Sequence, residues 1–258
     1  TAKVVQHMGS LDGRVALVTG AGPNIGGAIA KLLAANGAKV GCLDMKPEVA
    51  ASCADGINAA GGAATPLVAD ITNEAQVEKA FAQLVGTFGS LDILVNNVAI
   101  SLPGNLLDLP LEHWRRNVDV ILTGTFLCSR YGAKQMIAQG KGGAIVNIAN
   151  ASSHRGRAGS IGYVTSKGGV LTLTRVLAIE LAPHKIRVNS VSPTATGVAL
   201  VSGQRHDRSG PPKGIPLGRF GEPSDVAGAV LYLASPAAGY VTGIDIPVEG
   251  GSLAVFAT

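Results

Sequence analysis

The sequence predicts a doubly wound parallel sheet of about seven strands in one domain, with helices on both faces. Short apolar runs alternate with longer stretches of helical periodicity along the chain of 258 residues. These runs do not alternate between apolar and polar residues, so both faces of each strand are expected to be covered. No change in composition marks a second domain. A flexible tail is expected over residues 1–10 and a single domain over 11–258.

The expected strands are apolar or β-branched runs over residues 15–19, 39–43, 64–68, 91–95, 144–149, 186–191 and 244–248. Helical periodicity fills the segments between them. The first helix begins at Ile25 and ends before Gly37, because glycine readily adopts the positive φ of a helix C-terminus. Pro47 suits the first turn of the next helix. Thr72 or Asn73 can cap a helix over 73–88, and further helices are expected over 111–139, 161–182 and 223–234.

Composition and charge exclude several classes of protein. The chain is 47% hydrophobic and only 15% charged, which excludes a disordered protein. Its net charge of +4 is not gathered into a block, so neither a nucleic-acid nor a membrane partner is expected. No apolar run reaches the length of about 18 residues that suggests a membrane span. Three widely spaced cysteines, and five histidines without metal-ligand spacing, favour a reduced cytoplasmic protein without a metal site.

Ligands of an open parallel sheet bind outside the carboxyl ends of its strands. Six residues lie at or just beyond such ends, namely Gly20, Asp44, Asp70, Asn96, Asn150 and Pro193. The first of them belongs to a glycine-rich turn, TGAGPNIGG at 19–27, between a strand and a helix. Glycines there let the backbone approach a pyrophosphate, and the helix N-terminus attracts its charge. The sequence therefore predicts a dinucleotide site at this turn.

Asp44 indicates which dinucleotide is bound. A carboxylate at the end of the second strand can accept hydrogen bonds from both ribose hydroxyls of NAD, and it would repel the 2′-phosphate of NADP. Lys46 is the only nearby base that argues for NADP. NAD is the expected cofactor.

Tyr163 and Lys167 lie four residues apart on one expected helix, so they share a face. A tyrosine ionises near pH 10 in water, and a nearby buried ammonium would favour the phenolate. The oxidised nicotinamide would add a second positive charge. The pair therefore suits proton exchange near neutral pH.

These segments, with five others, resemble the short-chain dehydrogenase/reductase family in its common TGxxxGxG and YxxxK form. The resemblance spans residues 11–251 and is carried by TGAGPNIG at 19–26, LD at 43–44, AD at 69–70, NNVA at 96–99, YVTSK at 163–167, IRVNSVSP at 186–193, PLGRFGEPSDVA at 216–227 and YVTG at 240–243. It implies a Rossmann-like fold, a homotetramer, and an NAD-dependent oxidoreductase that interconverts a secondary alcohol and a ketone.

The resemblance also implies roles for single residues. Tyr163 is the acid/base, Lys167 lowers its pKa, and Asn150 orients the substrate oxygen. A loop over 194–214 would close over a small substrate. The implied cofactor-binding residues are Gly20, Asn24, Ile25, Asp44, Met45, Asp70, Ile71, Asn97, Val98, Tyr163, Lys167, Pro193, Thr196 and Val198.

Three departures from the family pattern concern the site. Asn24 replaces a glycine of the turn, and binding is expected to survive because Asn tolerates positive φ better than most residues. Asn150 replaces the catalytic serine, thirteen residues before the tyrosine, and its NH₂ group can donate to a carbonyl oxygen. Ser152 and Ser153 are alternative donors. Ile121 replaces a helical asparagine, so either its backbone carbonyl serves instead or proton exchange slows.

Two other functions stay open. The losses at Asn150 and Ile121 are compatible with a catalytically impaired NAD-binding or sensor protein of the same fold, although the retained Tyr163 and Lys167 count against it. Another family chemistry, such as that of a dehydratase, an epimerase or an enoyl reductase, is the second, although the short spacing in YVTSK at 163–167 counts against an enoyl reductase. Three basic residues follow the fifth strand and either flank the substrate or belong to a solvated loop, namely His154, Arg155 and Arg157.

Overall fold

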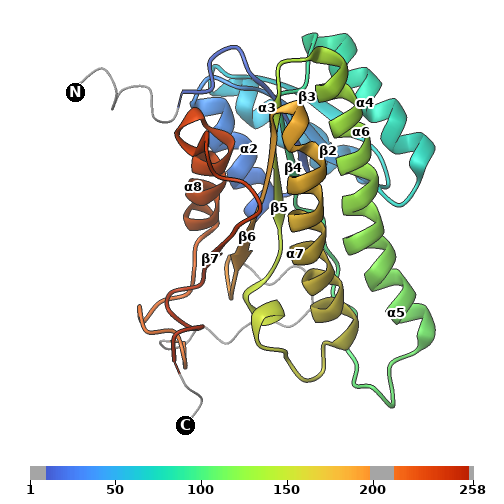
Figure 1. Cartoon of the computed structure of the whole chain (residues 1–258), viewed down its shortest axis with the longest axis vertical. Coiled ribbons are helices and arrows are strands. Elements are labelled where there is room, and N and C mark those ends of the chain that lie inside the picture. Colours follow the sequence, from blue (N-terminus) through green and yellow to red (C-terminus); the bar gives the residue numbers. More distant parts are fainter. Residues whose placement is uncertain (1–9, 198–211, 256–258) are drawn as a thin grey trace.

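The fold is described here from a computed structural model, for residues 10–197 and 212–255 (Figure 1). Seven parallel strands form one sheet in the order β3-β2-β1-β4-β5-β6-β7. Their bounds are Val15–Thr19 (β1), Lys39–Asp44 (β2), Ala63–Val68 (β3), Ile93–Asn96 (β4), Gly143–Ile148 (β5), Ile186–Pro193 (β6) and Asp245–Val248 (β7). The order reverses between β1 and β4, which is the switch point where open sheets of this kind bind ligands. The predicted fold class is confirmed.

Helices cover both faces of the sheet, as Figure 1 shows with α2 and α8 on one side and α6 and α7 on the other. Their bounds are Ile25–Ala35 (α2), Pro47–Ala59 (α3), Glu74–Phe88 (α4), Leu111–Val118 (α5), Gly124–Gln139 (α6), Ile161–Leu181 (α7) and Pro223–Ala234 (α8). One buried apolar cluster joins α2, α3 and α8 to the sheet, and a second joins α4, α6 and α7. Both faces of each central strand are therefore buried, which explains the continuous apolar runs.

Local sequence signals account for the ends of several helices. The Asn73 side chain accepts a hydrogen bond from the Gln76 backbone N–H at 3.1 Å and so caps α4, as expected. Gly89 ends the same helix with a φ of 85°, which favours glycine. Glu222 and Asp225 form reciprocal side-chain-to-backbone bonds that open α8.

The expected helix over 111–139 is confirmed, although it is not α-helical throughout. A π-helical turn over Asp119–Thr123 separates α5 from α6. Inside this segment the Ile121 carbonyl accepts a hydrogen bond from the Thr125 hydroxyl at 2.6 Å. Such an insertion leaves the apolar periodicity on both sides almost unchanged, so the sequence pattern cannot reveal it.

A chain of buried polar side chains lies beneath the carboxyl end of the sheet. The Asn96 NH₂ donates to Asn147 Oδ1 at 2.8 Å and to Ser129 Oγ at 3.0 Å. The Asn147 NH₂ then donates to Thr174 Oγ1 at 2.9 Å. These bonds tie β4 and β5 to α6 and α7, which carries Tyr163. Within the residues described, none of the helices is both long and apolar enough to cross a bilayer.

Candidate active site

A cavity of about 290 Å³ opens at the carboxyl ends of β1, β2 and β4. Residues far apart in the sequence meet there, and they include most of the predicted cofactor set: Gly20, Asn24, Ile25, Asp44, Met45, Asp70, Ile71, Asn97 and Val98. Lys46 and Arg116 line the same cavity. No pattern in the sequence pointed to Arg116, because it lies in α5 and reaches the site only through the tertiary fold.

The glycine-rich turn packs tightly against the start of α2. Gly20 has a φ of 65°, and a Cβ on Gly26 would lie 1.9 Å from the Gly20 carbonyl oxygen. Position 24, in contrast, does not need a left-handed backbone, because Asn24 has a φ of −113°. The Asn24 side chain reaches across to the segment after β6, where a Cβ on Gly197 would lie 1.8 Å from Asn24 Oδ1. Asn24 thus brings two walls of the site together.

Of the polar residues at the strand ends, Asn97 and Asp70 form hydrogen bonds with nearby chain segments, whereas Asp44 keeps a carboxylate oxygen for the cavity. The Asn97 NH₂ donates to the Thr19 and Gly20 carbonyls at 3.1 and 2.9 Å, so it supports the turn. Asp70 Oδ1 accepts from the backbone and hydroxyl of Thr72. Asp44 accepts only the Lys46 backbone N–H, at 3.0 Å, and forms no ion pair within the described part of the chain. Its second carboxylate oxygen is left for a ligand.

The segment after β6 forms the opposite wall. Pro193 ends β6, and Thr196 forms an isolated bridge with Gly221. Thr196 Oγ1 is buried and has no hydrogen-bond partner among the described residues. A buried hydroxyl without a partner is costly unless a ligand satisfies it. The Thr196 hydroxyl, the close-packed glycine turn and the free Asp44 oxygen together form a lining that fits a nicotinamide dinucleotide. Val198 and most of the loop expected over 194–214 lie outside the described residues.

Tyr163 and Lys167 lie one turn apart at the start of α7, beneath this wall. Lys167 is 2% exposed, and its Nζ donates to the Ile148 carbonyl at 2.5 Å. Burial lowers the pKa of Lys167 to about 7. Burial also raises the pKa of Tyr163 to about 12, while the positive charge of Arg157 and a hydrogen bond with Asn150 lower it. Arg157 and Asn150 are therefore the groups that oppose the effect of burial on the Tyr163 pKa.

Asn150 begins the short 3₁₀ turn over Ala151–His154 after β5. Its Oδ1 accepts from the Ser152 backbone N–H at 2.9 Å and from the Ser152 hydroxyl at 2.5 Å. Because the carbonyl end of the amide is occupied, the NH₂ end is the part available to a substrate oxygen. The Ser152 proton is committed to Asn150, which makes Ser152 a poor alternative donor. Ser153 Oγ is buried and has no partner in the described chain.

Ile121 is fully buried and packs with Ala149, Val170 and Leu171 next to Tyr163. The helix interruption at this position forms without the asparagine side chain that the family pattern led us to expect. The Ile121 carbonyl, which is the group that would serve in place of the asparagine side chain, accepts a hydrogen bond from the Thr125 hydroxyl.

Two residues of the site neighbourhood were not assigned a role from the sequence. Asn117 is fully buried, and its amide bonds both the N–H and the C=O of Leu102, at 3.3 and 3.2 Å. Gly104 in the same loop donates to the Gly159 carbonyl at 3.0 Å, just before α7. Asn117 therefore links α5 to the loop beside Tyr163. Arg157 is the second residue: the sequence left open whether it flanks the substrate or belongs to a solvated loop, and its positive charge lowers the Tyr163 pKa.

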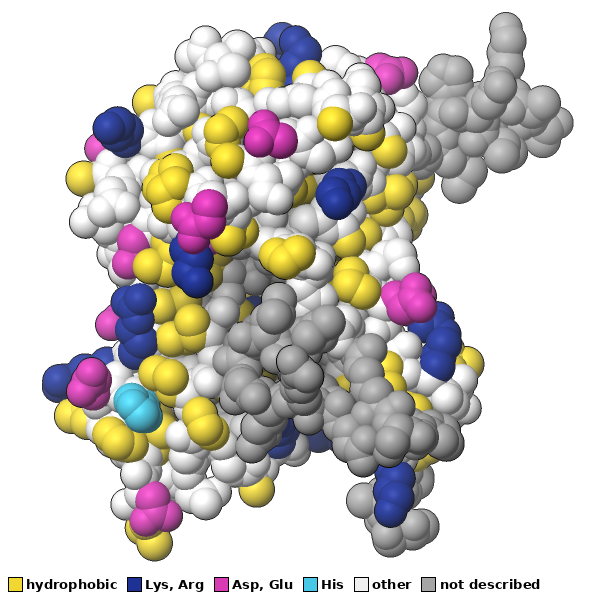
Figure 2. All heavy atoms as spheres, turned by 180° about the vertical axis from the view of Figure 1, so that it is seen from behind, with side chains coloured by type: hydrophobic (Ala, Val, Ile, Leu, Met, Phe, Trp, Pro, Cys, Tyr) yellow, Lys and Arg dark blue, Asp and Glu magenta, His cyan; other side chains and the backbone are white. Residues whose placement is uncertain are grey.

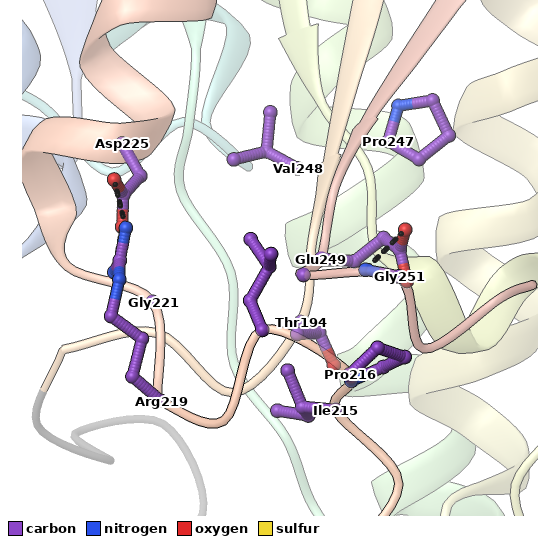
Figure 3. A pocket seen from close by; sticks show the side chains of 12 residues that line it. Thr194, Ile215, Pro216, Arg219, Gly221, Asp225, Pro247, Val248, Glu249 and Gly251 are labelled. Carbon is purple, nitrogen blue, oxygen red and sulfur yellow. Dashed lines mark hydrogen bonds and ion pairs between the residues drawn. The ribbon is translucent and has the colours of Figure 1, made fainter.

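A larger cavity of about 510 Å³ lies between the end of β7 and the segment before α8 (Figure 3). Thr194 forms one wall, and the Arg219–Asp225 ion pair, at 2.7 Å, forms another. Figure 3 shows the two side chains pointing toward each other. The catalytic candidates Asn150, Tyr163 and Lys167 are not among the residues that line this cavity.

Known proteins are similar to this chain in both sequence and fold. A family model described as enoyl-(acyl carrier protein) reductase matches residues 20–252. A short-chain dehydrogenase/reductase of Armillaria gallica is 38% identical over 93% of this chain and 96% of its own length. The solved carveol dehydrogenase of Mycobacterium avium, in complex with NAD, is 28% identical with a TM-score of 0.90. The gluconate 5-dehydrogenase of Burkholderia cenocepacia, in complex with NADP and tartrate, is 32% identical with a TM-score of 0.92. The chain aligns over 96% and 98% of its length with these two structures, and both are covered completely.

Proposed function

The chain belongs to the short-chain dehydrogenase/reductase family, and from this premise we propose that it is an NAD-dependent oxidoreductase that interconverts a secondary alcohol and a ketone. One observation carries the proposal. The Tyr163 phenol is half-buried beside the Asn150 amide, with the buried Lys167 one helical turn away, at the same edge of the sheet as the dinucleotide cavity. A binding or sensor protein would not need this acid–base pair, whose buried Lys167 costs stability.

The chemistry divides between the cofactor and the side chains of this chain. When bound, the nicotinamide supplies the carbon that accepts or donates the hydride. Tyr163 takes the hydroxyl proton during oxidation of the alcohol and returns it during reduction of the ketone. A protonated Lys167 stabilises the phenolate, and so does Arg157. The Asn150 NH₂ donates to the substrate oxygen while its charge changes.

The choice of NAD over NADP rests on Asp44. Solved relatives hold either cofactor, so family membership leaves the choice open. A 2′-phosphate would bring negative charge to the Asp44 carboxylate, which no cation pairs among the described residues. The Lys46 and Arg116 side chains line the cavity and are the groups that would oppose this preference.

We also infer a homo-oligomer. Large apolar side chains are exposed on the outer faces of α6 and α7, with Phe126 at 44%, Val176 at 45% and Ile179 at 76%. A second copy of the chain would cover such side chains. Light scattering should give a mass near four times the 26.0 kDa of one chain. On the face shown in Figure 2, Lys and Arg side chains are interspersed with Asp and Glu, which favours a small-molecule partner over nucleic acid.

A cytoplasmic location is part of the same proposal. Cys42, Cys53 and Cys128 are buried free thiols. The thiols of Cys42 and Cys53 form a hydrogen bond and are not joined by a disulfide. A reduced pair of neighbouring thiols is typical of a reducing compartment.

The decisive experiment is turnover of a panel of secondary alcohols and ketones with NAD and with NADP. Tyr163→Phe is the matched control, because it removes one oxygen atom and retains the ring. We expect NAD-dependent turnover that the control abolishes. Turnover that survives in the control would assign the chemistry to another group, and its absence throughout would favour the sensor interpretation.

A further inference from the structure

Four polar side chains from three elements meet behind the turn that carries Asn150. His154, the last residue of this turn, places its Nε2 2.9 Å from Asp245 Oδ2 and 3.3 Å from Ser192 Oγ. The other oxygen of Asp245 accepts from Ser190 Oγ at 2.6 Å. Ser190 and Ser192 are buried, and the Asp245 side chain is only 11% exposed. The cluster therefore joins the 3₁₀ turn to β6 and β7.

This cluster of a serine, a histidine and an aspartate is not arranged for nucleophilic catalysis. In a catalytic triad the carboxylate and the serine hydroxyl bind different nitrogens of the imidazole ring. Here both Asp245 and Ser192 contact the same nitrogen of His154. The His154–Asp245 pair is therefore a link between segments 91 residues apart in the chain.

The link acts on the turn that sets the direction of the Asn150 amide. Inside the turn, Ser152 holds the carbonyl end of that amide through two hydrogen bonds. The backbone closes the turn further, because the Ser153 N–H donates to the Asn150 carbonyl at 3.0 Å. These bonds fix the amide only relative to the turn. The bonds of His154 to β6 and β7 fix the turn relative to the sheet.

We propose that His154 is a positioning residue that, through Asp245, holds the Asn150 amide in register with Tyr163. The proposal rests on the proposed role of Asn150 in the oxidoreductase reaction. A displacement of about 1 Å at a reacting group can cost a factor of about 100 in rate. His154→Ala should therefore lower kcat about 10- to 100-fold and leave the affinity for NAD within about 2-fold.

A double-mutant cycle separates positioning from a general loss of structure. If His154 acts through Asn150, then His154→Ala should have no further effect on kcat in an Asn150→Ala background. His154→Gln should restore most of the activity, because its amide nitrogen can take the place of Nε2 and donate to Asp245. His184→Ala is the matched control, since His184 is exposed at the other end of β6. Multiplicative losses in the double variant would overturn the proposal.

Crystal structures of the His154→Ala and His184→Ala variants give a readout that does not require turnover. We expect the turn over 151–154 to move, or the Asn150 side chain to leave Ser152, only in His154→Ala. An unchanged turn in His154→Ala would refute the positioning role, even if kcat falls in that variant. If wild type turns over no substrate, the proposed function fails, whereas this comparison still decides the role of His154.

Discussion

Replacing Asn150 tests the least family-like part of the proposed mechanism. Tyr163 and the Asn150 NH₂ are the two donors expected to share the substrate oxygen. Loss of one such donor typically costs about 100- to 1000-fold in kcat, or about 3–4 kcal/mol of transition-state stabilisation. Asn150→Ala should therefore lower kcat by hundreds-fold on one chosen ketone, with little effect on NAD affinity measured by calorimetry. It should also lower stability by about 1 kcal/mol, because the Ser152 N–H and hydroxyl lose their acceptor.

Two matched variants separate the donor from the turn. Asn150→Asp retains an acceptor for Ser152 but lacks the NH₂ group, so it should lose activity and keep the turn. Asn150→Ser supplies a hydroxyl at the same place and should keep or raise activity. Thermal unfolding verifies that each variant is folded. Wild-type kcat in Asn150→Ala would refute the reasoning and direct attention to Ser153 or to a water molecule.

Four further predictions concern Tyr163, Asp44, Lys167 and Arg157. Tyr163→Phe should lower kcat about 100- to 10,000-fold and leave NAD binding nearly intact, and activity within a few-fold of wild type would exclude the phenol as the acid/base. Wild type should bind NAD more tightly than NADP in calorimetry, and Asp44→Ala should narrow the difference; equal or tighter NADP binding contradicts this. The pKa of Lys167 is lowered from 10.5 to about 7, so the unfolded state binds more protons between pH 7 and 10 and wild-type stability should rise across this range. Lys167→Met should therefore be more stable than wild type at pH 6, by about 5 kcal/mol and with a higher melting temperature, and should lose most of this advantage toward pH 10. Arg157→Gln should raise the Tyr163 pKa and so shift the rise of kcat/KM for alcohol oxidation to higher pH. Arg155→Gln is the control and should not shift it, because the Arg155 side chain bonds the Val255 carbonyl instead.

The fold could be predicted because the central strands are continuous apolar runs, which indicates that both of their faces are buried. The expected and observed strands differ by few residues, and β4 shows why. Leu91 and Asp92 are buried like the strand residues that follow them, but β4 begins only at Ile93. The Asp92 backbone still bonds both neighbouring strands, because its N–H donates to the Val15 carbonyl at 2.8 Å and its carbonyl accepts from the Ala144 N–H at 2.9 Å. The Asp92 carboxylate also accepts from the Val15 backbone N–H at 2.9 Å and from Arg14 at 3.2 Å. Hydrophobic periodicity reports burial, so it does not fix the first residue of the strand.

The candidate site could be predicted only where topology alone brings residues together. Strand ends meet at one edge of a parallel sheet, so Gly20, Asp44 and Asp70 were expected at one place, and all three line the cavity. Arg157 and the partnership of His154 with Asp245 depend instead on how loops fold back over long separations, and no period or spacing records that.

Two of the three departures from the family pattern, Asn150 and Ile121, have a common physical feature: each is hydrogen-bonded to a nearby hydroxyl. Ser152 bonds the Asn150 side chain two residues earlier, and Thr125 bonds the Ile121 carbonyl four residues earlier. In the first case the hydroxyl fixes which end of the amide faces Tyr163. In the second the hydroxyl gives the Ile121 carbonyl, inside the π-helical turn, a side-chain donor. Neither replacement therefore stands alone, and a variant that restores a family residue also changes the bonding of its hydroxyl partner. Asn150→Ser is therefore best compared with a double variant that also carries Ser152→Ala. Only this comparison separates the new hydroxyl at position 150 from the Ser152 hydroxyl, which loses its Asn150 acceptor.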